Sequence, residues 1–324
     1  MRRRIQVMQE SWNYLIILDA CRYDVFAQSW NRYFPTGRLE CVESVGTATI
    51  EWRDQSFRGR YPDVVYISAN PYINSRKPVL DFYGPDHFHS IVDVWATAWD
   101  TIAGTVYPDK VVQAALCALR DFPDKRLIVH FLQPHAPYIS QAGVLPGFPP
   151  PNLDNETVLT GIPNADGETP RQRKWFRRLC PIATPFLPAP GRWYIAQWLG
   201  MPPRTPMDCI RRRLGKHGLR QAYQANLDAV LKEVFRLVEY LPGRIVVSSD
   251  HGERLGEWGN YCHSPASSSR YLRQIPWLVI DHKSESRPIP KDLPDMSNPP
   301  SPDSITAEDQ ARIDERLRDL GYLE

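Results

Sequence analysis

Short, continuous runs of apolar residues alternate along the chain with segments in which apolar residues recur every three or four positions. Such runs, bounded by polar or turn-forming residues, are typical of strands buried on both faces of a parallel sheet. They occupy residues 14–20, 63–70, 126–135, 244–250 and 274–281. Helical spacing predicts helices over residues 22–34, 49–57, 109–122 and 219–241. The alternation predicts an α/β fold with a mostly parallel central sheet and helices on both faces.

Two segments lack this periodicity and set the predicted domain organisation. Residues 140–218 are rich in Pro, Trp and Arg, and a loop of this length is typical of a lid, a binding insertion or a disordered stretch. Residues 283–324 begin with a Pro- and Ser-rich stretch and end in a short helical pattern. We therefore expect one α/β domain over residues 1–282 that carries the insertion. A tether and a short C-terminal helix would follow it.

The composition is that of an ordinary globular protein. Of the 324 residues, 42% are hydrophobic and 23% are charged, and the formal net charge is +2. The arginines of the insertion form no recognisable nucleic-acid-binding motif, so nucleic acid is not an expected partner. No apolar run reaches the length of about 18–20 residues that a membrane-spanning helix needs.

The N-terminal sequence and the cysteines bear on the location of the protein. The basic start "MRRR" is followed by a short apolar stretch that ends in Asp19, which is typical of a buried strand rather than of a secretion signal. The six cysteines form no CxxC pair and are interpreted as reduced thiols. The sequence thus predicts a cytoplasmic protein.

Candidate chemistry lies where the predicted strands end. Asp19 follows the first run, His135 follows the third, and Asp250 and His251 follow the fourth, while Thr49 lies at a predicted helix start. Ligands of open α/β sheets bind outside the carboxyl ends of the strands, so we expect these side chains to converge on one edge. Carboxylates, an imidazole and a hydroxyl suit a divalent ion such as Zn²⁺, Mn²⁺, Mg²⁺ or Ca²⁺.

Each of these residues has a simpler structural explanation when it is taken alone. Asp19 and Thr49 are good helix caps, and His263 could be a surface histidine. The stretch "SSDHGERLGEWGNYCHSP" (248–265) is harder to explain in this way, because a turn accounts for its glycines and one acid but not for the cluster. The remaining predicted surface or structural histidines are His87, His89, His217 and His282.

Four motifs together resemble the alkaline-phosphatase superfamily, in particular its sulfatase-like branch of phosphoethanolamine and glycerol-phosphate transferases and sulfatases. The motifs are "LIILDACRYDVF", "VHFLQPHAPY", "VVSSDHGERLGEWGNYCHSP" and the terminal "LRDLGYLE". The resemblance implies that Asp19, Asp250 and His251 hold a metal ion. It also implies that His135 and His263 face the oxygens of the transferred group.

The nucleophile of this superfamily lies at a helix N-terminus. "TATIEW" is the matching segment and places the nucleophile, which is also a metal ligand, at Thr49; Thr47 is the alternative. A threonine cannot be converted to the formylglycine of sulfatases, but it can accept and pass on a phosphoryl group. Asp19 is followed by Ala20, where many sulfatases carry paired aspartates. These departures favour phosphate esters over sulfate esters.

Three further residues complete the predicted site. Arg22 is a candidate for binding substrate oxygens, and Glu253 and Asp24 are candidates for orienting the ligands by hydrogen bonds. One divalent ion is expected, with Zn²⁺ or Mn²⁺ favoured by the histidine ligand. Asp228 on the long helix is not followed by a histidine at a useful spacing, so the sequence indicates no second set of ligands.

The sequence therefore predicts a metal-dependent hydrolase or transferase that acts on a small anionic ester, a phosphate ester, through a threonine nucleophile. Two alternatives stay open. One is a sulfatase-like sulfuric ester hydrolase. The other is a non-catalytic descendant that binds an anionic glycan, a lipid head group or, less expectedly, a nucleic acid through the basic insertion.

Overall fold

The computed structural model describes residues 2–153, 192–198, 200–282, 286–290 and 292–293. The described residues fall in one compact unit that extends to Leu293. No helix among them is long and apolar enough to cross a membrane. The predicted C-terminal helix and most of the predicted tether lie outside the described residues, as does Cys180, and the five described cysteines are free thiols.

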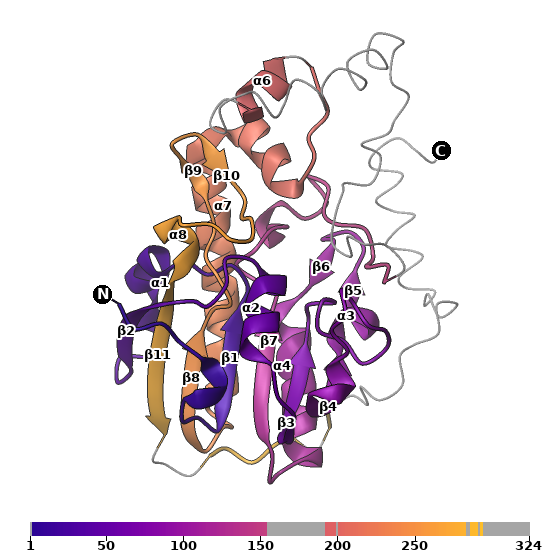
Figure 1. Cartoon of the computed structure of the whole chain (residues 1–324), viewed down its shortest axis with the longest axis vertical. Coiled ribbons are helices and arrows are strands. Elements are labelled where there is room, and N and C mark those ends of the chain that lie inside the picture. The colour runs from indigo at the N-terminus through magenta and orange to yellow at the C-terminus, as the bar shows by residue number, and fades with distance from the viewer. Residues whose placement is uncertain (1, 154–191, 199, 283–285, 291, 294–324) are drawn as a thin grey trace. The chain divides into compact units, whose positions relative to one another are not determined.

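A seven-stranded sheet forms the centre of the molecule, with the strand order β2-β11-β8-β1-β7-β3-β4 (Figure 1). Its strands are β1 (Tyr14–Leu18), β2 (Arg38–Glu43), β3 (Tyr61–Ser68), β4 (Phe88–Asp93), β7 (Arg126–Phe131), β8 (Gly243–Ser248) and β11 (Gln274–His282). Strands β8, β1, β7, β3 and β4 are parallel neighbours, whereas β11 is antiparallel to both β8 and β2. The predicted mostly parallel sheet is confirmed.

The strands that the sequence did not predict lie at the two edges of this sheet. All five residues of β1 are buried, which explains its continuous apolar run. Strand β2 instead alternates between more and less exposed residues, and β4 is buried only at its first residue. Edge strands contact the core on fewer sides, so they carry mixed sequences that do not form apolar runs.

Helices cover both faces of the sheet, as predicted. On one face, α2 (Thr49–Ser56) buries Trp52 against side chains of β1, β3, β7 and β8. The helices α1 (Tyr23–Ser29), α4 (Pro108–Asp121) and α7 (Pro206–Val238) pack together, with α4 and α7 behind the sheet in Figure 1. The short elements are α3 (Val94–Thr97), β5 (Trp99–Asp100), β6 (Thr105–Val106), α6 (Arg192–Trp198), β9 (Leu255–Glu257), β10 (Asn260–Tyr261) and α8 (Arg270–Arg273).

Part of the predicted insertion is helical, which corrects the interpretation of residues 140–218 as aperiodic. Helix α7 begins at Pro206 rather than near residue 219, because Thr205 caps it by accepting a hydrogen bond from the Asp208 N–H. Gly215, with φ of 69°, interrupts its helical backbone. This interruption separates the two halves of the pattern and hid the first half from sequence analysis.

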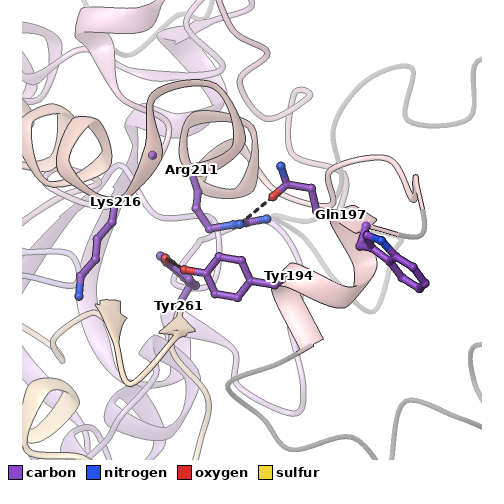
Figure 2. Close-up of a pocket in the computed structure, with 7 residues that line it drawn as sticks. Tyr194, Gln197, Arg211, Lys216 and Tyr261 are labelled. Carbon is purple, nitrogen blue, oxygen red and sulfur yellow. Dashed lines mark hydrogen bonds between the residues drawn. The ribbon is translucent and has the colours of Figure 1, made fainter.

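Two basic residues in the described part of this region, Arg211 and Arg212, form ion pairs with Asp208. Arg211 forms an ion pair of 2.8 Å with the buried Asp208, and its guanidinium lies 5.3 Å and 5.5 Å from the ring centroids of Tyr194 and Tyr261. Figure 2 shows Arg211, Tyr194 and Tyr261 around a pocket of about 460 Å³, where Gln197 also accepts a hydrogen bond from Arg211. Arg211 of α7 therefore contacts both α6 and β10 and links them to α7.

Candidate functional site

Loops at the carboxyl ends of β1 and β8 meet in the middle of the sheet because these strands are neighbours. Asp19 follows β1, and Asp250 and His251 follow β8, so all three reach the same edge. With Thr49 they form a buried cluster that we call the inner group. The structure thus brings together the four residues that the sequence predicted as metal ligands.

Thr49 is the first residue of α2 rather than its cap, which corrects the alternative interpretation of this residue. Ala48 occupies the cap position and has no side chain that could bind the first N–H groups. The hydroxyl of Thr49 is consequently free to donate a hydrogen bond of 2.8 Å to Asp250 Oδ2. The same oxygen lies 3.3 Å from His251 Nε2.

The two aspartates of the inner group are held in different ways. Asp250 Oδ1 accepts hydrogen bonds from the backbone N–H groups of Ala20 at 3.0 Å and His251 at 2.8 Å. Asp19 Oδ2 accepts one of 2.8 Å from the side chain of Asn70. Asp19 Oδ1 is buried and has no hydrogen-bond partner in the part of the chain that the structure describes. A buried carboxylate oxygen without a partner is costly unless a cation binds it.

The ring of His251 is oriented by its own loop. Its Nδ1 lies 2.8 Å from the carbonyl oxygen of Gly252, so Nδ1 carries the proton and the lone pair of Nε2 faces the inner group. Nε2 lies 3.3 Å from Asp250 Oδ2 and 3.8 Å from Asp19 Oδ1. Gly252 is required here because a Cβ would lie 2.1 Å from the carbonyl oxygen of Tyr271.

His130 is a site residue that the sequence analysis missed. It lies on β7 beside Ile17 of β1, and one atom of His130, Asp19 and Asp250 each lie within 4.8 Å of one another. Its Nδ1 is 2.9 Å from the hydroxyl of Tyr66, and its buried Nε2 has no hydrogen-bond partner among the described residues. Burial lowers the pKa of His130 to about 4, so the ring is neutral and able to act as a ligand.

His135, Glu253 and His263 form a second group, the outer group, next to the first. Glu253 Oε2 lies 3.2 Å from His263 Nδ1 and 4.0 Å from His135 Nε2. The ring of His263 lies 4.2 Å from that of His251, measured between centroids. Glu253 is 1% exposed, whereas His135 and His263 are only partly buried. These three residues could also hold a metal ion, a possibility that the sequence did not reveal.

The charges of the two groups depend on each other. Burial, reinforced by the negative charge of Asp250, raises the pKa of Asp19 well above its usual range. Burial would also raise the pKa of Asp250, but the neighbouring His251 and His130 lower it overall. Neighbouring buried carboxyl groups whose pKa values are shifted in opposite directions are typical of a functional site.

The two histidines of the outer group have pKa values that are shifted in opposite directions. Burial lowers the pKa of His135 to about 4. Burial also acts to lower the pKa of His263, but the charge of Glu253 and its hydrogen bond raise it overall. Glu253 itself has a lowered pKa, because His263 outweighs the effect of burial. His263 is therefore protonated more readily than His135, whose ring is neutral at pH 7.

Arg22 and Asp24 lie beside these groups and are bonded to each other. The guanidinium of Arg22 donates hydrogen bonds of 2.9 Å and 2.6 Å to Asp24 and one of 2.7 Å to Glu257. Arg22 is buried, and its Nη1 also lies 3.3 Å from the carbonyl oxygen of Glu253. Their predicted roles toward the substrate and the ligands remain predictions, and the contacts seen here support the loop that carries Glu253.

Thr47, the alternative nucleophile, has a different environment from Thr49. Its hydroxyl lies 2.9 Å from Glu51 Oε2 and 2.8 Å from the carbonyl oxygen of Ser264, and it accepts a hydrogen bond from the Ser267 N–H. These contacts join the start of α2 to the loop after His263. The hydroxyl of Thr47 is thus occupied by contacts between loops, whereas that of Thr49 faces the inner group.

Comparisons with known proteins give only distant structural likenesses. No protein-family model and no curated protein matches the chain. The chain is similar to the C-terminal periplasmic domain of EcEptC from Escherichia coli in complex with Zn, at 13% identity and a TM-score of 0.47, over 87% of this chain and 73% of that one.

Two further solved structures give similar values. The soluble domain of lipooligosaccharide phosphoethanolamine transferase A from Neisseria meningitidis has 14% identity and a TM-score of 0.46, over 87% of this chain and 77% of that one. The phosphonate monoester hydrolase of Agrobacterium radiobacter has 12% identity and a TM-score of 0.45, over 87% and 68%.

The inner group fits a divalent cation on its own chemistry. Two carboxylates, a hydroxyl and the Nε2 of His251 surround one buried place, and the unpartnered oxygen of Asp19 faces it. A cation would offset both the burial and the negative charge of Asp250, which together raise the pKa of Asp19. Mixed oxygen and nitrogen ligands suit Zn²⁺ or Mn²⁺.

Proposed function

We propose that the protein is a metal-dependent enzyme that hydrolyses phosphate esters or transfers their phosphoryl-containing group, with Thr49 as the nucleophile. The position of the Thr49 hydroxyl carries this proposal. It lies 2.8 Å from Asp250 Oδ2 and 3.3 Å from His251 Nε2, at the start of a helix. Asp19, Thr49, Asp250 and His251 would hold one divalent ion, with His130 as a further candidate.

A divalent ion held by these residues would supply a Lewis acid, which would lower the pKa of the Thr49 hydroxyl and offset the charge of the substrate. Asp250 accepts the hydrogen bond of that hydroxyl, which directs an oxygen lone pair toward the substrate. The first N–H groups of α2 have no capping side chain, so they are available for the phosphoryl oxygens. Thr49 then attacks phosphorus, and the ester oxygen leaves.

The outer group acts on the opposite side of the transferred group. His263 carries the raised pKa and can donate a hydrogen bond to a phosphoryl oxygen or to the leaving oxygen. His135, with its pKa near 4, contributes a neutral ring. Water or an acceptor alcohol resolves the phosphothreonine, and these two choices distinguish a hydrolase from a transferase. The substrate is a small anionic ester, and the predicted cytoplasmic location remains a prediction.

Substitution of Thr49 tests this function. Thr49→Ala should reduce turnover of an aryl phosphodiester by at least about 10³-fold, because it removes the proposed nucleophile. The hydroxyl of Ser249 also lies 3.4 Å from Asp250 Oδ1, but it is bonded to the carbonyl oxygens of Leu18 and His251. Circular dichroism and metal content should change little. Thr47→Ala is the matched control and should keep most of the activity.

Mass spectrometry of the acid-quenched wild-type enzyme should find phosphate on Thr49. If Thr47→Ala abolishes turnover and Thr49→Ala does not, the nucleophile is two residues earlier. Aryl phosphate, phosphodiester and sulfate substrates should be compared in parallel. Turnover of the sulfate alone would indicate a sulfatase-like hydrolase, and the absence of both metal and turnover would indicate a binding protein.

A further inference from the structure

A separate pocket opens beside the outer group. Its volume is about 730 Å³, which lies within the range of small-molecule binding sites. Two of its lining residues, Arg254 and Ser264, directly follow Glu253 and His263 in the sequence. The pocket therefore borders the outer group. It is larger than a phosphate group needs, and it leaves room for the rest of an ester.

Two arginines give this pocket positive charge. Arg254 donates a hydrogen bond of 2.7 Å to the hydroxyl of Ser267, and Arg270 lies 3.0 Å from the hydroxyl of Tyr271. Neither arginine forms an ion pair with a carboxylate in the described part of the chain. Both guanidinium groups can therefore bind an anion, and their planar donors suit a carboxylate or phosphate group.

The acid that lines this pocket does not cancel that charge. Glu257 forms ion pairs of 2.7 Å with both Arg22 and Arg220, and its second oxygen accepts the Leu255 N–H. Its pKa is lowered, mainly by Arg22 acting against burial. The charge of Glu257 is thus balanced by Arg22 and Arg220. Arg254 and Arg270 therefore give the pocket a net positive charge.

An exposed tryptophan lies at the edge of the pocket. Trp258 is 86% exposed at the tip of the β9–β10 hairpin, and its φ is 52°. The next residue, Gly259, has φ of 73°. Two-residue hairpin turns with positive φ at both positions favour Asn-Gly, and a bulky residue at the first position is an outlier. The ring is thus kept in solvent at a position where Asn would suit the fold better.

Hydroxyl and amide groups form much of the remaining lining. They come from Ser264, Ser267, Ser268, Ser269 and Asn260. These side chains both donate and accept hydrogen bonds, as hydroxyl groups of a ligand require. An aromatic face, unpaired guanidinium groups and a hydroxyl-rich wall together match a ring that carries several hydroxyls and a negative charge.

We propose that this pocket binds an acidic sugar, which forms the part of the ester that lies beyond the scissile phosphate. The carboxylate or phosphate of the sugar pairs with Arg254 and Arg270, and the ring packs on Trp258. The serine hydroxyls bind the sugar hydroxyls. The role of the sugar as part of the substrate rests on the proposed function of the site, whereas its binding can be tested separately.

Calorimetry on the metal-loaded protein tests the charge of the pocket. Trigalacturonate has no phosphoester, so its binding does not depend on the proposed catalysis, and maltotriose is the matched neutral probe. Trigalacturonate should bind about ten-fold more tightly than maltotriose at low salt. The double variant Arg254→Gln/Arg270→Gln should lose this preference. Arg236 is an exposed arginine near the C-terminal end of α7, and the control variant Arg236→Gln should keep this preference.

Replacement of the tryptophan tests the ring contact. Trp258→Asn should weaken both sugars about five- to ten-fold, while the melting temperature stays equal or rises because Asn suits the turn. Equal binding of the charged and neutral sugars would overturn the proposal, as would an equal loss in Arg236→Gln. Tighter binding of AMP than of trigalacturonate through the same two arginines would also overturn it and indicate a nucleotide site. If Thr49→Ala keeps full turnover, only the catalytic proposal is rejected, because the binding of the sugars is measured without catalysis.

Discussion

The inner and outer groups lie side by side but are built differently. The inner group combines three oxygen side chains with one imidazole, and all of its members are buried. The outer group places one buried carboxylate between two histidines that are 16% and 24% exposed. The inner group is enclosed and is fixed by strand ends, whereas the outer group is open toward solvent. This difference agrees with the proposed function, in which the inner group holds the ion and the outer group contacts the substrate.

The backbone gives the reason for this difference. Asp250 is held by the N–H groups of Ala20 and His251, and Ala20 has a positive φ of 57°, a strained conformation for a residue with a Cβ. His135 and His263 are instead positioned by loops that follow β7 and β10. Substitutions of Asp19, Asp250 or His251 should therefore remove metal and activity together, whereas those in the outer group should affect activity more than metal.

His251→Ala should have the largest effect. The variant loses a nitrogen ligand and the contact to Thr49, so metal and turnover should fall together, with turnover reduced at least about 10⁴-fold. Elemental analysis and aryl phosphodiester assays measure the two quantities. His217→Ala, an exposed histidine on α7, serves as the control. Retention of metal with full loss of turnover would place His251 outside the ion site.

His263→Ala should lose rate but keep the metal of the inner group. We expect turnover to fall by about 10²–10³-fold, as for loss of a donor to developing negative charge. The same two measurements decide the outcome. If the variant loses one equivalent of metal and the wild type holds two, the outer group binds an ion of its own and His263 is a ligand rather than a hydrogen-bond donor.

Acidification should destabilise the metal-free protein through the buried histidines. The pKa of His130 is about 4 in the folded state against 6.5 ordinarily, so the unfolded chain binds more protons between these values. The free energy of unfolding should therefore fall by about 3 kcal/mol for this residue as the pH drops from 6.5 to 4. Urea unfolding at several pH values should show a smaller fall in the free energy of unfolding for His130→Asn than for the wild type. An equal dependence on pH in the two proteins would contradict this prediction.

Glu253→Gln should have a smaller effect, confined to the outer group. Without the carboxylate, the pKa of His263 should fall, because Glu253 is what raises it. Turnover should drop about ten-fold, and the alkaline limb of the pH–rate profile should move to lower pH as His263 loses its proton earlier. Metal in the inner group should stay. An unchanged alkaline limb would show that another group sets it.

The sequence predicted the parts of the site that lie at strand ends. Asp19 and Asp250 end continuous apolar runs, and the strand order makes β1 and β8 neighbours, so their convergence follows from the α/β pattern. His130 could not be found in this way, because it lies inside an apolar run where a histidine looks like part of the core. Its role emerges only from the register that places it beside Ile17.

Other features depended on contacts that no local pattern contains. The outer group exists because the loop after β10 returns His263 to Glu253, and this distance is set by the whole hairpin. The edge strands β2 and β4 were missed because half-buried strands lack continuous apolar runs. The first half of α7 was hidden by Gly215 and by the absence of a regular apolar face.

The central position of β1 has a consequence for synthesis of the protein. Strand β1 pairs with β7 and β8, which begin at Arg126 and Gly243, so one of its hydrogen-bonding edges stays open until β7 is made and the other until β8 is made. Ribosomes add about 5–20 residues per second, so the apolar segment "YLIIL" waits unpaired for several seconds. Exposed apolar strands of this kind favour aggregation. A nascent chain stopped before Arg126 should therefore depend on chaperones more than one that already contains β8.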